Sequence, residues 1–371
     1  MRILFPLDLF YPSKVGGPAN TLYWLCKALV RNGHDVTVVS TQRGIDKGKV
    51  EIDKWVDVDG IATRYCGSES KISFSVIRHS IKKLKTSEVI VFSSICYLPN
   101  FFIALAAGIR KKRIVWSPRG ELFDTAIGGS RGKKMYFALL RMLLGNQILF
   151  HATSEEEKST IERYFPNSKV VIIPNYMEMP ERQTVESSYG CFLYVGRIAP
   201  IKALERLVEG LSLSKLFRNS QYKFKMVGGV EKQFEEYYKG LLAQVERLGL
   251  SDKVEFVGSL TGEDKFKAYA AARYSFLVSN SENFGNVVIE ALSQGTPVVA
   301  STGTPWSRLP VEEAGFWIQN TPNAIAETVD YIILQSNEEY NSYRHGALNY
   351  SKEFDVYEHV DEWEKILNQC V

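Results

Sequence analysis

Apolar runs of strand length alternate with helical stretches along this chain, and the alternation begins again near its middle. In the first half, the strand-like run Ile3–Leu7 precedes the helical stretch 19–32 and a second strand-like run at 36–40. In the second half, the run Phe192–Val195 opens a similar series and precedes the helical stretch 204–211. Strands that alternate with helices typically form a parallel sheet covered by the helices. The pattern therefore predicts two doubly wound, Rossmann-like α/β domains.

The length of the chain and one polar stretch support this division. With 371 residues the chain is long for one hydrophobic core and suits two domains. A polar stretch at 177–189 follows the strand-like run and turn at 170–176. We place the boundary there, which gives one domain over 1–180 and a second over 181–349. Residues 350–371 have the apolar spacing of an amphipathic C-terminal helix.

Positive charge is concentrated in the first half of the chain. Residues 1–180 hold 26 Lys and Arg against 16 Asp and Glu, whereas residues 181–371 hold 19 against 26. Much of the excess surrounds the apolar and basic segment 133–144. Such a segment can lie on an anionic membrane surface, or it can be an ordinary helix whose apolar side chains face the core. Nucleic acid is a poorer explanation, because the second half is acidic and no recognition motif is present.

The N-terminal run and the cysteines favour a reducing compartment. Asp8 interrupts the first apolar run, which therefore does not have the shape of a signal peptide. Five scattered cysteines without C-x-x-C spacing favour neither disulfides nor a metal site. Residues 89–109 carry no charge over a length that can span a membrane. Pro99 divides them, however, so we expect a strand and then a helix over 101–107 with Asn100 as its cap.

Two glutamates with seven residues between them, Glu282 and Glu290, lie on either side of a predicted helix start. The apolar spacing over 287–292 predicts that this helix begins near Gly285, and a strand follows at 297–300. The start of a helix presents unpaired N–H groups and partial positive charge, which suit a diphosphate. Carboxylates on the approach loop and one turn into the helix can accept hydrogen bonds from sugar hydroxyls. Two glutamates at one spacing are weak evidence when taken alone.

A second motif follows the strand-like run that opens the second half. Gly196 ends that run, and Arg197 and Lys202 flank the turn into the next helix. Arginine offers a planar fork of donors and lysine a compact charge, so the two together suit a diphosphate. An ordinary surface loop can carry the same residues. The two motifs in one domain, both near predicted helix starts, make a stronger prediction than either one.

In spacing and order the two motifs resemble the G-R-x-x-x-x-K and E-x7-E segments of the retaining glycosyltransferases of family 4. The resemblance covers nearly the whole chain, is strongest over 191–301 and is thin over 42–110. It implies the GT-B fold, in which two Rossmann-like domains face a cleft. It also implies that the first domain binds the acceptor, that the second binds a nucleotide-sugar donor, and that the C-terminal helix crosses back onto the first domain.

The resemblance implies that the second domain holds the donor. Glu282 and the backbone at the helix start would contact the sugar and diphosphate, and Glu290 would contact the ribose. The base would rest on backbone groups near residues 255–260, which leaves uracil, guanine and adenine open. The implied donor-binding residues are Gly16, Gly17, Gly196, Arg197, Lys202, Val257, Gly258, Phe284, Gly285, Asn286 and Glu290, and the implied catalytic residues are Glu282, Arg197, Lys202 and Arg119.

The first domain departs from the family at one position. Many members carry a histidine after a strand in the middle of this domain, whereas the corresponding stretch V-W-S-P-R-G-E-L at 115–122 has none. Arg119 is our candidate for that place, and Glu121 and Asp124 are candidates to face the acceptor. Gly16 and Gly17 follow the first strand, where glycines let a backbone approach a ligand, and the resemblance implies that they face the donor phosphates or the acceptor.

The implied reaction retains the configuration of the transferred sugar. The acceptor hydroxyl would attack on the face that the nucleotide diphosphate leaves, and a phosphate oxygen would take its proton. Positioning and fixed positive charge would then carry the catalysis, with no metal and no further cofactor. Asp57-Val58-Asp59 is a poor match to a metal-binding D-x-D motif. The partners would be a UDP- or GDP-sugar and a glycan or lipid-linked acceptor in surface polysaccharide synthesis.

Two other functions stay open from the sequence. A nucleotide-sugar epimerase of the same fold would bind a similar donor, and a two-domain ligand-binding protein could have the same architecture but would normally be exported. We expect a cytoplasmic protein, peripheral on the inner face of the plasma membrane, whose basic first domain contacts anionic lipid.

Overall fold

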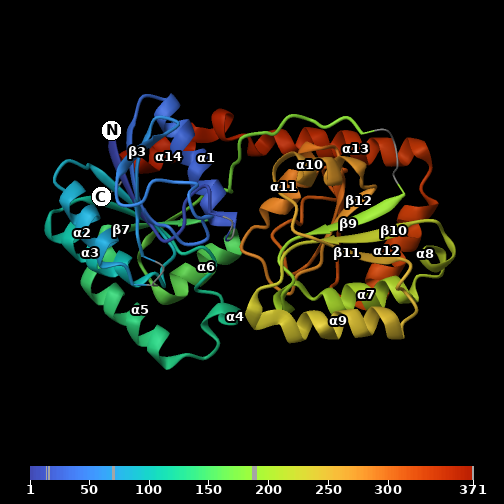
Figure 1. The fold of residues 1–371 in the computed structure, drawn as a ribbon. Coiled ribbons are helices and arrows are strands. Elements are labelled where there is room, and N and C mark those ends of the chain that lie inside the picture. Colours follow the sequence, from blue (N-terminus) through green and yellow to red (C-terminus); the bar gives the residue numbers. More distant parts are fainter. Residues whose placement is uncertain (14, 16, 69–71, 186–189, 370–371) are drawn as a thin grey trace. The chain divides into compact units, whose positions relative to one another are not determined.

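The computed structural model describes residues 1–13, 15, 17–68, 72–185 and 190–369, which form two compact units (Figure 1). Unit 1 consists of Met1–Glu178 and Asp355–Val371, and unit 2 consists of Met179–Phe354. The chain passes from unit 1 to unit 2 after Glu178 and returns to unit 1 after Phe354. Unit 2 is a parallel sheet, unit 1 is parallel except for one edge strand, and helices cover both sheets, so the predicted fold class is confirmed.

Unit 1 is built on an eight-stranded sheet in the order β3-β4-β2-β1-β5-β6-β7-β8. Its strands are β1 (Arg2–Leu7), β2 (Asp35–Thr41), β3 (Trp55–Val58), β4 (Ile61–Cys66), β5 (Val89–Ser93), β6 (Arg113–Ser117), β7 (Ile148–Ala152) and β8 (Lys169–Ile172). The edge strand β3 pairs antiparallel with β4, and the other neighbouring strands pair in parallel. Strands β5 and β7 are buried along their whole length, as expected for the inner strands of a covered parallel sheet.

Most helices of unit 1 lie between these strands in the chain, and α14 follows unit 2. They are α1 (Gly17–Arg31), α2 (Phe74–Lys83), α3 (Leu98–Ile109), α4 (Asp124–Ile127), α5 (Arg131–Leu144), α6 (Glu155–Tyr164) and α14 (Val356–Gln369). The large aromatic side chains Trp116 and Phe92 lie in the core, with ring centroids 4.7 Å apart. None of the helices in the described part of the chain is long and apolar enough to cross a membrane.

Two helix starts in unit 1 differ from the prediction. Helix α1 begins at Gly17, two residues before the predicted start at Ala19. Helix α3 begins at Leu98, so Asn100 lies in the first turn and does not cap it. Its side-chain amide instead donates to the carbonyl of Ser93 at 2.9 Å, at the end of β5. The prediction treated Pro99 as a break, but the first turn of a helix accepts proline because its N–H groups have no intrahelical partner.

The C-terminal helix also begins later than predicted. Residue 350 belongs to α13 (Asn337–Ser351) of unit 2, and a 3-10 turn, η4 (Lys352–Phe354), follows it. Helix α14 then packs against α1 of unit 1. Trp363 lies against the ring of His151 with centroids 4.5 Å apart, and Glu364 pairs with His34 at 2.8 Å. These contacts hold the last helix in the first unit.

Unit 2 is built on a six-stranded parallel sheet in the order β11-β10-β9-β12-β13-β14. Its strands are β9 (Cys191–Val195), β10 (Lys223–Val227), β11 (Val254–Gly258), β12 (Tyr274–Leu277), β13 (Val298–Ser301) and β14 (Gly315–Ile318). Its helical segments include η2 (Pro200–Lys202), α7 (Leu204–Leu213), α8 (Lys215–Asn219), η3 (Lys232–Phe234), α9 (Glu235–Arg247), α10 (Gly262–Ala271), α11 (Asn286–Ser293), α12 (Pro322–Leu334), α13 and η4.

Candidate active site

The order in which strands are added to the unit 2 sheet reverses in its middle, between β9 and β12. From β9 the chain runs outward to β10 and β11, and it then returns to add β12, β13 and β14 on the other side. The loops after β9 and β12 therefore diverge, and ligands of open α/β sheets bind where adjacent loops part in this way. The first of these loops carries Lys202 and the second carries Glu282.

Lys202 and Glu282 form an ion pair at this point of the sheet. Their side chains are only 14% and 15% exposed. The hydroxyl of Ser279 donates to the same carboxylate oxygen at 3.1 Å, and the backbone N–H of Asn280 donates to the carbonyl of Ile201 at 2.9 Å. The two motifs found in the sequence are thus in direct contact. An ammonium has three donors, so Lys202 can contact an anion and Glu282 together.

The loop that carries Glu282 is held in place up to the start of α11. The Glu282 N–H donates to the carbonyl of Gly303 at 2.9 Å. A Cβ on Gly303 would lie 2.5 Å from the carbonyl oxygen of Asn280, so this approach requires glycine. Gly285 caps α11 with a φ of 85°, which favours glycine, and the carbonyl of Phe284 accepts from Trp306 Nε1 at 2.5 Å. Helix α11 begins at Asn286, next to the predicted start.

Glu290 lies one turn into α11 and is bound on both carboxylate oxygens. Lys265 Nζ contacts Oε1 at 2.7 Å, and the hydroxyl of Tyr269 donates to Oε2 at 3.1 Å. Both partners lie on α10, four residues apart and so on one helix face. Glu290 is only 6% exposed. Sequence reasoning missed Lys265 and Tyr269, because it predicted no helix over 262–271 that would place them on one face.

Arg197 has a different partner from Lys202. It pairs with Glu231 at 2.6 Å, and the guanidinium holds the pKa of that carboxyl below its usual range. The Arg197 side chain is 55% exposed and is therefore accessible to an anion. The turn behind it is tight, because a Cβ on Gly228 would lie 1.8 Å from the carbonyl oxygen of Gly196. Gly228 also donates its N–H to the carbonyl of Gly258, at 2.8 Å.

The predicted base contacts lie at the end of the edge strand β11. The pairing with β10 skips one residue there, since Met226 is opposite Phe256 and Val227 is opposite Gly258. Val257 is left out of the register and is 37% exposed. Contact of the base with Val257 and Gly258 stays a prediction.

In unit 1 a strained turn follows β6 and carries Arg119. The φ angles are 59° at Arg119 and 75° at Gly120, both in the left-handed region. The carboxylate of Glu157 accepts the Gly120 N–H at 2.6 Å and the Thr153 N–H at 2.8 Å. Glu157 belongs to the first turn of α6 and is 1% exposed. A buried carboxylate thus fixes the turn in which the family histidine is absent.

The guanidinium of Arg119 is only partly satisfied. Its Nη1 donates to Asn175 Oδ1 at 2.7 Å, whereas Nε and Nη2 are buried without a hydrogen-bond partner among the described residues. Burial lowers the pKa of Arg119 to about 10. On the next strand, burial and then the charge of Arg119 lower the pKa of His151 to about 3, so this histidine is neutral. His151 is held by Ser117 Oγ at 2.7 Å and by the Ile173 carbonyl at 2.8 Å.

The two acceptor candidates have different surroundings. The Glu121 carboxylate accepts from Ser94 Oγ and from the Cys96 N–H, each at 2.7 Å, and burial raises its pKa. These bonds tie the loop after β6 to the loop after β5. Asp124 begins α4, is largely exposed and pairs with Arg163 at 3.2 Å. Contact of Glu121 or Asp124 with an acceptor stays a prediction.

Of the two glycines predicted near the phosphates, Gly17 is the first residue of α1 and Gly16 lies outside the described residues.

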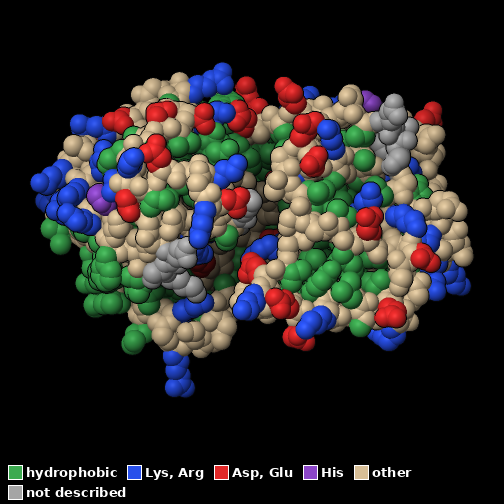
Figure 2. Space-filling model, viewed as in Figure 1, with side chains coloured by type: hydrophobic (Ala, Val, Ile, Leu, Met, Phe, Trp, Pro, Cys, Tyr) green, Lys and Arg blue, Asp and Glu red, His purple; other side chains and the backbone are tan. Residues whose placement is uncertain are grey.

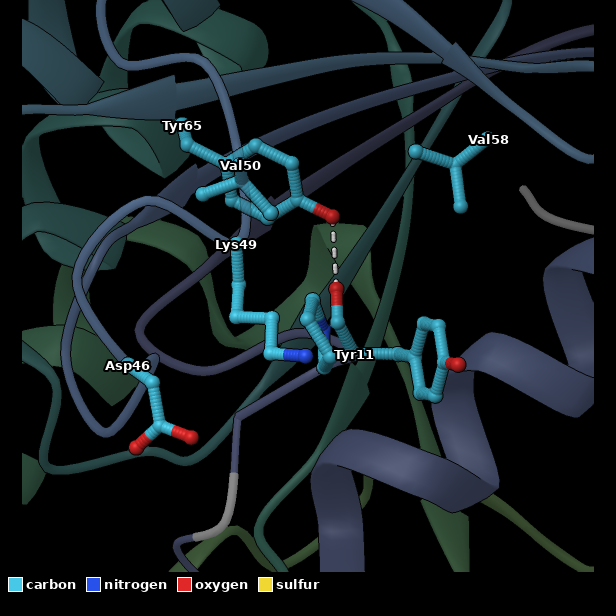
Figure 3. A pocket seen from close by; sticks show the side chains of 7 residues that line it. Tyr11, Asp46, Lys49, Val50, Val58 and Tyr65 are labelled. Carbon is cyan, nitrogen blue, oxygen red and sulfur yellow. Dashed lines mark hydrogen bonds between the residues drawn. The ribbon is translucent and has the colours of Figure 1, made fainter.

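Unit 1 also contains a pocket that the sequence did not reveal (Figure 3). Its volume is about 370 Å³, and it is lined by Tyr11, Pro12, Asp46, Lys49, Val50, Val58 and Tyr65. The hydroxyl of Tyr65 donates to the carbonyl of Tyr11 at 2.6 Å, and Lys49 extends toward the same backbone. The ring of Tyr11 stacks on Tyr23 at 4.3 Å. The pocket thus combines aromatic walls with charged side chains near the ends of β1 and β2.

Comparisons with known proteins agree with this architecture. Residues 178–349 match the family model described as glycosyl transferases group 1, and residues 15–178 match the model described as Glycosyltransferase Family 4. A GDP-mannose:cellobiosyl-diphosphopolyprenol alpha-mannosyltransferase of Xanthomonas campestris is 23% identical, over 99% of this chain and 97% of the relative.

Solved structures with the same fold cover the whole chain. Anabaena Alr3699/HepE, solved in complex with UDP and glucose, matches with a TM-score of 0.76 at 18% identity over 99% of both chains. Sucrose-phosphate synthase of Thermosynechococcus elongatus matches with a TM-score of 0.77 at 18% identity, over 100% of this chain and 98% of that one. With its two halves matched by glycosyltransferase domain families and its units arranged as doubly wound sheets, the chain is a glycosyltransferase of the GT-B type.

Proposed function

We propose that this protein transfers a sugar, with retention of configuration, from a nucleotide-diphosphate sugar to a glycan or lipid-linked acceptor. The contact between Lys202 and Glu282 at the switch point of the unit 2 sheet carries the proposal. It unites one cation and one sugar-binding carboxylate beside the start of α11. A relative whose name specifies GDP-mannose and a diphosphopolyprenol acceptor, and a fold neighbour solved with UDP, support a nucleotide sugar as donor.

The donor would lie with its diphosphate against the α11 start and Lys202. The helix start and the two cations, Lys202 and Arg197, would stabilise the charge that develops on the leaving diphosphate. Glu282 would accept hydrogen bonds from the sugar hydroxyls, and Glu290 would accept from the ribose. Because these charges are fixed in place by the protein, we propose that the reaction needs no metal ion.

Retention would follow from attack on the face that the leaving group departs from. The acceptor hydroxyl forms the new bond to the anomeric carbon while the bond to the diphosphate oxygen breaks. A phosphate oxygen takes the hydroxyl proton, so no protein base is required. The protein contributes by holding both reactants in position and by stabilising charge.

Unit 1 would supply the acceptor contacts. The guanidinium of Arg119 would occupy the place of the family histidine, where its two unpaired nitrogens offer donors to an anion or a hydroxyl. The pocket between Tyr11 and Lys49 is large enough for a sugar ring, and aromatic rings with charged neighbours suit such a ligand. Glu121 and Asp124 remain candidates for the acceptor side.

A panel of UDP- and GDP-sugars, offered with polyprenyl-diphosphate-linked glycans, tests this proposal. We expect one donor to raise the melting temperature and to yield a longer glycan by mass spectrometry, with the α or β linkage of the donor preserved in the NMR coupling. Lys202→Ala and Glu290→Ala should each reduce transfer by about a hundredfold or more while the protein stays folded. Unchanged transfer with chelator supports metal independence. Isomerisation of the donor sugar without transfer would instead indicate a nucleotide-sugar epimerase. Normal turnover of both Lys202→Ala and Glu290→Ala would refute the assigned site.

A further inference from the structure

We propose that the outer surfaces of α3 and α5 in unit 1 dock on an anionic lipid membrane. Helix α5 carries two apolar stripes. Phe137, Leu140 and Leu144 are buried against the core, whereas Met135 and Met142 point outward and are 73% and 74% exposed. One side of the helix therefore faces the core, as expected for an ordinary amphipathic helix, and the other side faces solvent. Its other side holds large apolar side chains that no described residue of the protein covers.

The outer stripe of α5 has regular helical spacing. Met135, Leu139 and Met142 follow one another at intervals of four and three residues and so lie on one face, with Leu143 beside them. Leu139 and Leu143 are 41% and 42% exposed. Single exposed apolar side chains are common on soluble proteins, but a continuous stripe of four on one helix is not explained by chance exposure.

Helix α3 extends this apolar surface. It packs beside α5, with the rings of Phe101 and Tyr136 at 5.7 Å. Its own outward side chains include Phe102, which is 45% exposed, and Ile109, which is 84% exposed. Figure 2 shows the apolar side chains that gather over this part of unit 1, at the lower left. We define the docking face as Leu98, Phe102, Ile109, Met135, Leu139, Met142 and Leu143.

The charges around the docking face match an anionic surface. Helix α5 contains no acidic residue, and its exposed Arg131, Lys134 and Arg141 lie along one border of the apolar stripe. Arg110 and Lys111 follow the end of α3. Over residues 74–144 the chain holds 13 Lys and Arg against 3 Asp and Glu. An apolar stripe bordered by cations is the pattern of helices that lie in the headgroup region of membranes.

A second copy of the chain fits this face less well. In a symmetric dimer the same surface meets itself, so the arginines and lysines of both copies would lie opposite one another. Because α5 has no acidic side chain to pair with them, such an interface would bury like charges near one another. Lipid phosphates have the opposite sign and remove this repulsion.

The docking face is linked to the loop of the predicted acceptor residues. The hydroxyl of Tyr136, on α5, donates to the carbonyl of Ile95 at 2.9 Å. The next residue, Cys96, donates its N–H to Glu121. A lipid-linked acceptor would then be met next to the surface that holds its lipid. The docking surface itself is argued from exposure and charge and stands even if the proposed reaction is wrong.

Vesicle co-sedimentation of the full chain tests the docking face. We expect binding to vesicles of phosphatidylcholine mixed with phosphatidylglycerol, much weaker binding to phosphatidylcholine alone, and a loss of binding in high salt. Met135→Glu with Met142→Glu should weaken binding by about tenfold or more. Lys134→Ala with Arg141→Ala should weaken it by about thirtyfold, since each cation near the surface contributes about fivefold.

Matched variants keep this test decisive. Val311→Glu with Leu334→Glu changes side chains of unit 2 that are 80% and 71% exposed, and it should leave vesicle binding unchanged. Should the two glutamates lower the melting temperature, Met135→Gln with Met142→Gln removes the apolar contact without added charge. The proposal is overturned if the wild type ignores anionic vesicles, if the α5 variants bind like the wild type, or if light scattering shows a dimer that the methionine variants dissociate. Nucleotide-sugar binding, measured in parallel, reports on the proposed reaction independently.

Discussion

Replacing Arg119 with methionine is expected to stabilise unit 1 and to reduce transfer strongly. The guanidinium is buried, and two of its nitrogens have no hydrogen-bond partner among the described residues. Lowering its pKa from 12.5 to about 10 corresponds to a penalty of about 3 kcal/mol on the charged form. The bond to Asn175 offsets about 2 kcal/mol of this penalty. A methionine of similar length removes both terms, so we expect a net gain of about 1 kcal/mol in the free energy of unfolding.

Scanning calorimetry of the full chain measures this gain. A gain of about 1 kcal/mol in a unit of this size raises the melting temperature by about 3 °C. Transfer should fall by about a hundredfold or more if Arg119 acts in the proposed place of the family histidine, because the variant offers no hydrogen-bond donor there. Arg119→Lys serves as the control: it keeps the charge but not the planar fork, and should be less stable than the wild type. A lower melting temperature for Arg119→Met, or transfer at the wild-type rate, would refute the reasoning.

Three further predictions concern the other charged groups. Lys202→Met should lower the free energy of unfolding by about 2 kcal/mol, because it leaves the largely buried Glu282 without its ion-pair partner. Adding Glu282→Gln should recover most of this loss, as measured by urea unfolding in a double-mutant cycle. Additive effects of the two substitutions would contradict the pairing. Lys265→Met should weaken nucleotide binding less than Glu290→Ala does, because it frees the carboxylate that we propose contacts the ribose. Calorimetric titration of each variant with the nucleotide shows which of the two binds it more weakly. Burial holds the pKa of His151 near 3 against about 6.5 when unfolded, so the unfolded chain binds the extra proton and stability falls as the pH drops. Between pH 7 and pH 5 the loss should be about 2 kcal/mol by urea unfolding, and a flat profile would contradict a buried neutral imidazole.

The sequence predicted the fold well because the relevant signal is local. Apolar runs of strand length and helical spacing mark each element within the chain itself, and the structure confirms the strands that they predicted, usually within one residue. The errors occurred at helix ends. Proline and glycine near Leu98 and Gly17 suggested breaks, whereas the first turn of a helix accepts both residues.

The sequence predicted the part of the site that lies in two local motifs, and missed the part that depends on packing between elements. Lys202 and Glu282 belong to loops that follow adjacent strands, so the motif order and the strand order together brought them close. The partners of Glu290 and Arg119 could not be predicted, since Lys265 and Asn175 reach them only through the packing of separate elements. The pocket near Tyr11 has the same origin, because three segments of the chain enclose it and none has a distinctive pattern alone.

Unit 1 is completed by the last residues of the chain, and this fixes an order of events during synthesis. A ribosome releases residues 1–178 long before α14, and all of unit 2 emerges in between. Until α14 arrives, the face of α1 that it covers is bare, and Arg113 lacks the carbonyl of Leu367 that it contacts at 2.9 Å. Unit 2 is one continuous stretch of chain, so it needs no later segment to complete it and can fold once it leaves the ribosome. A nascent chain stalled before α14 would therefore hold all of unit 2 but an incomplete unit 1, although residues 1–178 of unit 1 were made first.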